Sequence, residues 1–145
     1  MKIAMICYSL TGESTGLRLK EGLEKLGHSV QLWEKSKYLP DSIKESCSQW
    51  TGDRFGDSQA VIFIGACGIA VRSIAPFVAS KKTDPAVLVV DECSRFVISL
   101  LSGHLGGDNE LAGTAAKILD AMPVVTTAKD LHKCLAVDVF AKKND

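Results

Sequence analysis

Glycines and a histidine gather in the segment 100–110, Leu-Leu-Ser-Gly-His-Leu-Gly-Gly-Asp-Asn-Glu. The segment joins a strand-like apolar run at 96–101 to a helix-like run at 111–119. Glycine is costly to order, so its repetition at this turn indicates that backbone N–H groups must approach another group closely. The N-terminus of a helix favours an anion in that position. We expect the anion to contact Ser102, Gly103, Gly106, Gly107 and Asn109.

His104 is the residue of this segment best suited to chemistry, because an imidazole exchanges a proton near neutral pH. A serine nucleophile at Ser102 with His104 as its base lacks an identified third group. A metal site formed by His104 and Asp108 would need a helix that begins before the glycines allow. We therefore predict that His104 is a general acid or base. The alternative is a histidine that caps the helix by bonding to the backbone.

A second strand-to-helix segment, 9–15, carries hydroxyl groups and a glycine. Ser9, Thr11 and Gly12 are its candidate anion-binding residues, because hydroxyls and exposed N–H groups cradle phosphates or carboxylates. The pattern is similar to the phosphate loop of flavodoxins. Helix capping by serine or threonine explains the same residues without any ligand, and it stabilises a helix by about 1 kcal/mol.

A third segment, 65–72, combines Gly65 and Gly68 with Arg72. An arginine about one turn inside a helix opposes the helix dipole, so Arg72 predicts a carboxylate partner. That carboxylate belongs either to a ligand or to the protein, as a salt bridge with Asp91 or Glu92, and the two alternatives stay open. Cys67, at the start of this helix, is a weaker candidate because no base for a thiol nucleophile lies beside it in the sequence.

Short runs rich in Val and Ile alternate with segments of helical period along the whole chain. Continuous apolar strands are covered on both faces, which predicts an α/β fold with a doubly wound, mainly parallel sheet and flanking helices. The short gap between 86–90 and 96–101 predicts one antiparallel hairpin. We expect strands at 3–8, 29–33, 60–64, 86–90, 96–101 and 123–127, and helices at 14–26, 40–50, 69–78 and 111–119.

Ligands of such sheets bind outside the carboxyl ends of the strands, so we expect all three glycine-containing segments to meet at that edge. Residues 1–130 are expected to form a single α/β domain. The tail at 131–145 completes no element of its own, and it is expected to begin a linker or the middle region of a longer protein.

The overall composition argues against several functional classes. Lys plus Arg and Asp plus Glu both number 17, so no net charge attracts nucleic acid. No apolar run approaches the roughly 20 residues that span a bilayer, and no signal peptide is evident. The five cysteines form no CxxC pair, so neither a disulfide framework nor a zinc ribbon is indicated. We expect a cytoplasmic protein with reduced thiols and no membrane partner.

Taken together, these segments resemble the CbiG proteins of anaerobic cobalamin biosynthesis, which are cobalt-precorrin-5A hydrolases. The resemblance lies in 62–76, 82–92, 96–109 and 123–128, about half of the chain in order. It departs from the family at Cys93-Ser94, where an acidic turn and a glycine are usual, at Asp108 and at Lys129. Family members continue into a middle region and a C-terminal domain, so the resemblance implies an N-terminal domain.

The resemblance implies hydrolytic opening of a ring lactone in a cobalt-corrinoid intermediate, with release of acetaldehyde. It implies that His104 is the acid or base and that amides near Gly106 and Gly107 hold an oxyanion or a substrate carboxylate. Cobalt belongs to the substrate, so no cofactor and no protein-bound metal are expected. The implied partners are a cobalt corrinoid and the C-terminal domain of the same protein.

Two other functions stay open. The first is a flavodoxin-like electron carrier that binds flavin mononucleotide on the segment 9–15. The second is a non-catalytic docking domain.

Overall fold

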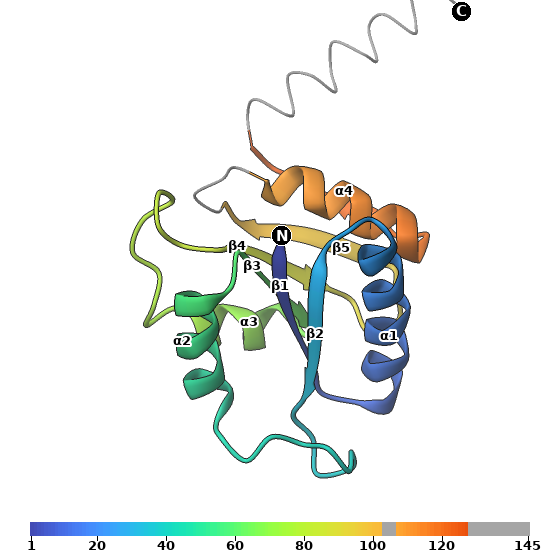
Figure 1. Ribbon diagram of the computed structural model, residues 1–145, viewed down its shortest axis with the longest axis vertical. Helices are drawn as coiled ribbons and strands as arrows, with labels where there is room; N and C mark the ends of the chain where they lie inside the picture. The colour runs from blue at the N-terminus through green and yellow to red at the C-terminus, as the bar shows by residue number, and fades with distance from the viewer. Residues whose placement is uncertain (103–106, 128–145) are drawn as a thin grey trace, which may run out of the picture.

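The computed structural model describes residues 1–102 and 107–127, where the chain forms one mixed sheet flanked by helices (Figure 1). The predicted tail at 131–145 lies outside the described residues. The strands are β1 (Lys2–Cys7), β2 (Ser29–Glu34), β3 (Ala60–Ile64), β4 (Ala86–Val90), β5 (Phe96–Leu101) and β6 (Met122–Val124). The helices are α1 (Leu10–Lys25), α2 (Cys47–Asp57), α3 (Cys67–Ile74) and α4 (Asp108–Leu119).

The strand order is β2-β1-β3-β4-β5-β6, and the direction of the strands changes once across the sheet. β1 is parallel to β2 and β3, and β3 is parallel to β4. β5 is antiparallel to β4, and β6 is parallel to β5. The expected α/β class and the antiparallel hairpin are therefore confirmed, and β5 and β6 run opposite to the other strands.

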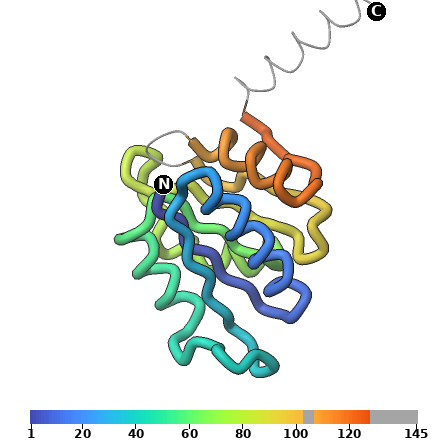
Figure 2. Tube along the Cα trace, turned by 45° about the vertical axis from the view of Figure 1, so that its right-hand side comes forward, coloured from blue at the N-terminus to red at the C-terminus, as the bar shows by residue number. Residues whose placement is uncertain are grey.

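Alternate residues of the central strands point to opposite faces and fill two apolar layers. Ile3 and Ile62 pack with α1 and α4 on one face, whereas Ile6 and Phe63 pack with α2 and α3 on the other. Both faces are covered, which is why these strands are almost uninterrupted Val, Ile, Leu and Phe. On the first face α1 and α4 lie side by side (Figure 2).

Several helix boundaries differ from those expected from apolar periodicity, because capping residues set them. α1 begins at Leu10 rather than at 14, since Ser9 is its N-cap. α2 was expected at 40–50, which is wrong: a capping box of Ser46 and Gln49 starts it at Cys47. α3 begins and ends earlier than the expected 69–78. None of the helices in 1–102 and 107–127 combines the length and the apolar character needed to cross a bilayer.

Candidate functional site

The three candidate segments do not meet at one edge of the sheet, so that expectation is wrong. β1 and β3 end at Cys7 and Ile64, and the segments 9–15 and 65–72 follow at what we call the carboxyl edge. β5 runs the other way: Val87, near the start of β4, pairs with Leu101, the last residue of β5. Ser102 therefore lies at the opposite edge, where β1, β3 and β4 begin, which we call the amino edge.

The described residues after Ser102 confirm this separation. Gly107, the N-cap of α4, lines a pocket of ≈ 240 Å³ together with Met1 and His28, which lie at the starts of β1 and β2. A strand of five residues spans about 17 Å, so Gly107 and Asn109 do not share a small site with Ser9 or Gly65. His104, Gly103 and Gly106 lie outside the described residues, and their roles stay predictions.

At the carboxyl edge, the N-cap residue of α1 is already bonded to a carboxylate of the protein. The Ser9 hydroxyl accepts a hydrogen bond from the Gly12 N–H at 2.9 Å and donates one to Glu92 Oε2 at 2.5 Å. Only Tyr8 and Ser9 separate β1 from α1, so the region lacks a phosphate loop of the flavodoxin kind. The flavodoxin alternative is therefore not favoured, and helix capping explains Ser9.

The other two candidates of this segment lie within the first turn of α1. Thr11 is exposed, whereas Gly12 is buried against β1. A Cβ at Gly12 would lie 3.2 Å from Ser9 Oγ and 3.3 Å from Cys7 Cβ. Glycine at this position thus lets α1 start directly above the end of β1, whether or not a ligand binds there.

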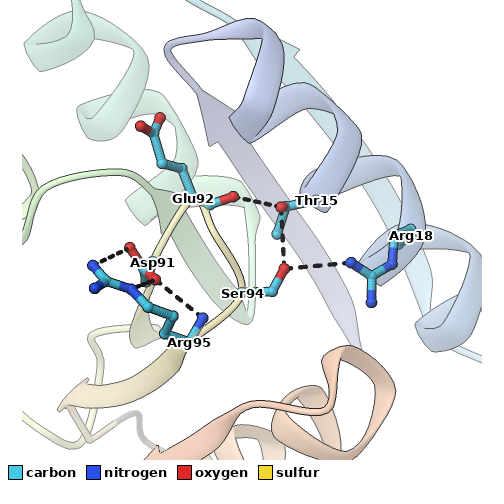
Figure 3. A network of polar contacts seen from close by, with 6 residues as sticks. All are labelled: Thr15, Arg18, Asp91, Glu92, Ser94 and Arg95. Atoms are coloured by element: carbon cyan, nitrogen blue, oxygen red, sulfur yellow. Dashed lines mark hydrogen bonds and ion pairs between the residues drawn. The ribbon is translucent and has the colours of Figure 1, made fainter.

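The turn between β4 and β5 is fastened to α1 by a polar network (Figure 3). The Thr15 hydroxyl donates to the Glu92 carbonyl oxygen at 2.6 Å and lies 3.2 Å from Ser94 Oγ. Across the turn, Arg95 Nε donates to Asp91 Oδ2 at 2.8 Å, which holds the pKa of Asp91 below its usual value. Asp91 is thus paired with Arg95, and the alternative of a salt bridge from Arg72 to Asp91 or Glu92 is not formed.

Arg72 lies on α3 beside the glycines of the third segment. A Cβ at Gly68 would lie 3.3 Å from Arg72 Nη1, so the side chain extends back over the start of the helix. Arg72 itself is in the last turn of α3, where the dipole favours a cation, so the expected conflict with the dipole is wrong. Arg72 is exposed, and its guanidinium has no ion pair within the described residues. The structure therefore removes the reason for expecting a carboxylate partner, and a ligand contact of Arg72 stays a prediction.

Gly65 has a packing role that the sequence did not reveal. A Cβ at this position would lie 2.9 Å from Tyr8 Cδ2, so the glycine makes room for the tyrosine ring. The Tyr8 hydroxyl lies 3.2 Å from Cys47 Sγ, which in turn lies 3.3 Å from Ser73 Oγ. Burial raises the pKa of Tyr8, so the side chain stays a neutral phenol. Tyr8 was not among the predicted site residues, although its position directly after β1 could have indicated that it lies at the carboxyl edge.

Tyr8 and its neighbours form a pocket at the carboxyl edge. It measures ≈ 370 Å³ and is lined by Tyr8, Ser9, Gly65, Ala66, Ile69, Asp91 and Glu92. The pocket offers hydroxyl and phenol groups for hydrogen bonding, but its charged lining residues are both acidic. In the described part of the chain, no group of His, Cys, Asp or Glu side chains is arranged to hold a metal ion.

At the amino edge, the polar residues near α4 are bonded within the protein. Asp108 is 4% exposed and accepts a hydrogen bond from Ser99 Oγ at 2.6 Å. Asn109 Nδ2 donates to Thr127 Oγ1 at 2.9 Å. Asp108 therefore faces the sheet, and its carboxylate is shielded from an anion that approaches the start of α4. Gly107 caps α4 without a side-chain hydrogen bond.

Comparisons with known proteins agree on one family. The family description "Cobalamin synthesis G N-terminal" matches residues 49–130. Two relatives named cobalt-precorrin-5A hydrolase, from Salmonella typhimurium and Priestia megaterium, are 40% and 49% identical over 96% and 88% of this chain. The chain spans only 39% and 36% of their lengths. The crystal structure of a cobalamin biosynthesis protein G homolog from Sulfolobus solfataricus matches 86% of this chain and 36% of its own, with a TM-score of 0.70 and 27% identity.

Proposed function

The chain belongs to the family of cobalamin synthesis G N-terminal domains, and from this membership we propose that it is the substrate-recognition or catalytic part of a cobalt-precorrin-5A hydrolase. The proposed reaction opens the ring lactone of a cobalt-corrinoid intermediate and releases acetaldehyde. One observation carries the proposal: a relative of that name is 49% identical over 88% of the chain. Cobalt enters with the substrate, so the proposal needs no cofactor held by the protein.

The substrate proposed here is a large polyanion, since its macrocycle carries acetate and propionate side chains. A domain that recognises it needs cations and N–H groups on fixed elements, because a carboxylate is bound best by charge-assisted hydrogen bonds. Opening a lactone also needs an activated water, a proton donor and stabilisation of an oxyanion. His104 is the proposed acid or base. The relatives are longer than this chain, and the proposed partner for catalysis is the C-terminal domain that such longer proteins contain.

A binding titration of this chain tests recognition. The probe is a cobalt corrinoid whose peripheral carboxyl groups are free, and its visible absorption reports binding. We expect saturable binding with one corrinoid per chain. A lack of saturation at millimolar corrinoid would refute a recognition role for this domain.

Turnover in a full-length relative separates recognition from catalysis. Replacement of the histidine corresponding to His104 by alanine should lower turnover by about 10²–10⁴-fold, the usual effect of losing a general acid or base, with corrinoid affinity unchanged. Unchanged turnover would instead support the non-catalytic docking domain.

A further inference from the structure

The turn between α3 and β4 is built around a buried carboxylate. Asp84 is 5% exposed, and its Oδ2 accepts hydrogen bonds from the N–H groups of Ala79 at 2.9 Å and Ser80 at 3.2 Å. The Asp84 N–H donates back to the Ser80 carbonyl at 2.8 Å. Burying a carboxylate is unfavourable unless such bonds compensate, so this one holds the backbone of the turn in a defined shape.

Two adjacent lysines lie on that turn. Lys81 and Lys82 are exposed, and within the described residues neither ammonium group has an ion pair or an aromatic partner. The Lys82 backbone N–H donates to Ser80 Oγ at 3.1 Å, which ties the lysines to the same hydrogen-bonded turn. Neighbouring like charges repel each other, and a bound anion relieves that repulsion.

The lysine turn lies at the same edge of the sheet as Ser102 and the start of α4. Asp84 and Pro85 lead directly into β4, whose Val87 pairs with Leu101 at the end of β5. Ser102 therefore follows at the same edge, and α4 begins there. Figures 1 and 2 both show the segment between α3 and β4 at the same end of the sheet as the N-terminus and the start of α4.

The charges at this edge favour a carboxylate-bearing ligand more than those at the carboxyl edge do. The carboxyl-edge pocket is lined by Asp91 and Glu92. Of the arginines in its loops, Arg95 is paired with Asp91, and Arg72 is exposed without an ion pair among the described residues. At the amino edge Asp84 and Asp108 are both buried and hydrogen-bonded, which leaves Glu110 as the exposed acid in the first turn of α4.

From this arrangement we infer that Lys81 and Lys82 bind peripheral carboxylates of the substrate, at the edge of the sheet where Ser102 and the start of α4 also lie. The inference rests on the proposed function, because the ligand is the corrinoid proposed above. The lysines are specificity-determining residues in this scheme: they recognise the acid side chains of the macrocycle and take no part in the bond-breaking steps.

The test compares corrinoid affinity in matched charge variants. The probe is the same cobalt corrinoid with free carboxyl groups, and its fully esterified form is the neutral reference. The Lys81→Ala/Lys82→Ala variant should bind the acid about tenfold more weakly, as expected for loss of two exposed ion pairs, and its affinity should depend less on salt. The Lys81→Arg/Lys82→Arg variant should bind within about twofold of the original chain, because it keeps both charges.

The control removes the same charge from the other edge. Lys37→Ala/Lys44→Ala replaces two exposed lysines in the segment after β2, and it should leave affinity for the acid unchanged. Equal affinities of the original chain and the Lys81→Ala/Lys82→Ala variant would overturn the inference while the proposed function stands. No saturable binding by the original chain would instead refute the recognition role itself. An equal loss in both double variants would show a general charge effect and would also overturn the inference.

Discussion

The two edges of the sheet use their charged residues in different ways. At the carboxyl edge, Asp91 pairs with Arg95 and Glu92 accepts a hydrogen bond from Ser9, so the acids fasten the β4–β5 turn to its surroundings. At the amino edge, Asp84 is buried inside its own turn, and the lysines of that turn point outward without partners among the described residues. The acids of the β4–β5 turn are bonded within the protein, whereas the α3–β4 turn presents two lysines without such partners among the described residues.

The difference comes from the reversal of β5. In a wholly parallel sheet, the carboxyl ends of all strands lie at one edge, and ligands bind there. Here β5 is antiparallel to β4, so its carboxyl end and the start of α4 lie at the opposite edge. Ligand binding at the carboxyl ends of strands is therefore possible at either edge of this sheet. The side chains at each edge decide which of the two suits a given ligand.

The largest expected effect is that of Asp84→Ala at the amino edge. The variant leaves the N–H groups of Ala79 and Ser80 without their acceptor, so we expect a loss of about 2 kcal/mol in the free energy of unfolding, measured in urea. We also expect weaker corrinoid binding, because the turn no longer holds the lysines in place.

The corrinoid affinity of Asp84→Ala distinguishes the effect of a fixed turn from the effect of the Asp84 charge. Asp84→Ala removes a negative charge beside two lysines, so a purely electrostatic view expects tighter binding of an anion. Asp84→Asn removes the same charge but keeps one acceptor oxygen, and it should retain more of the affinity. Tighter binding by Asp84→Ala would contradict the role of a fixed turn.

A smaller loss is expected at the carboxyl edge for Thr15→Val. Thr15 is 4% exposed and its hydroxyl donates to the Glu92 carbonyl, so the variant should lose about 1 kcal/mol of stability in urea unfolding. Thr11→Val, on the exposed face of the same helix, is the control and should stay within about 0.5 kcal/mol. Corrinoid affinity should not change in either variant. A marked loss of affinity in Thr15→Val would place the ligand at the carboxyl edge.

The central strands and the hairpin could be predicted from the sequence, because their signals are local. β3, β4 and β5 have the predicted bounds, since buried runs of Val, Ile and Leu are hard to mistake. α2 was misplaced because its apolar pattern is weak, although Ser46 and Gln49 carried a capping signal that could have corrected it.

The candidate site was less predictable, because its grouping depends on contacts between distant parts of the chain. The bond from Ser9 to Glu92 joins residues 83 positions apart, and no local pattern indicates it. The predicted antiparallel hairpin already implies that β5 ends at the edge opposite the ends of β1 and β3, and that Ser102 lies there. The expectation of one shared edge overlooked this consequence.

A pH-dependent effect is expected from Glu34, at the carboxyl end of β2. A hydrogen bond with Glu13, burial, and the charges of Glu13 and Asp41 raise the pKa of Glu34 from 4.5 to about 7. The folded chain therefore holds a proton that the unfolded chain loses above 4.5, so stability falls as pH rises from 4.5 through 7. Glu34→Gln should remove this dependence.

The measurement is urea unfolding at two pH values. At pH about 8, Glu34→Gln should be more stable than the original chain by roughly 1 kcal/mol, a value reduced for solvent screening of a partly exposed group. At pH about 4.5 the two should be equally stable. Glu24→Gln, on the exposed face of α1, should show neither effect. If Glu34→Gln raises the free energy of unfolding equally at both pH values, the raised pKa of Glu34 is not the cause of the stabilisation.

The smallest net effect is expected at Ser94, where two contributions oppose each other. Ser94 has φ of 63°, in the left-handed region that a side chain adopts at a cost of about 1 kcal/mol. Its hydroxyl contacts Thr15 Oγ1 at 3.2 Å and accepts from Arg18 Nη1 at 3.5 Å, which together return about the same amount. Ser94→Gly relieves the first and loses the second, so its unfolding free energy should stay within about 0.5 kcal/mol of the original.

Ser94→Ala isolates the backbone contribution. Alanine keeps the unfavourable φ and loses both hydroxyl contacts, so it should be about 1 kcal/mol less stable than Ser94→Gly in the same urea experiment. That difference would explain why a glycine suits this turn, and why serine replaces it here only with partners on α1. If the two variants are equally stable, the left-handed conformation is not under strain. The turn would then be held in this conformation by the Asp91–Arg95, Ser9–Glu92 and Thr15–Glu92 hydrogen bonds.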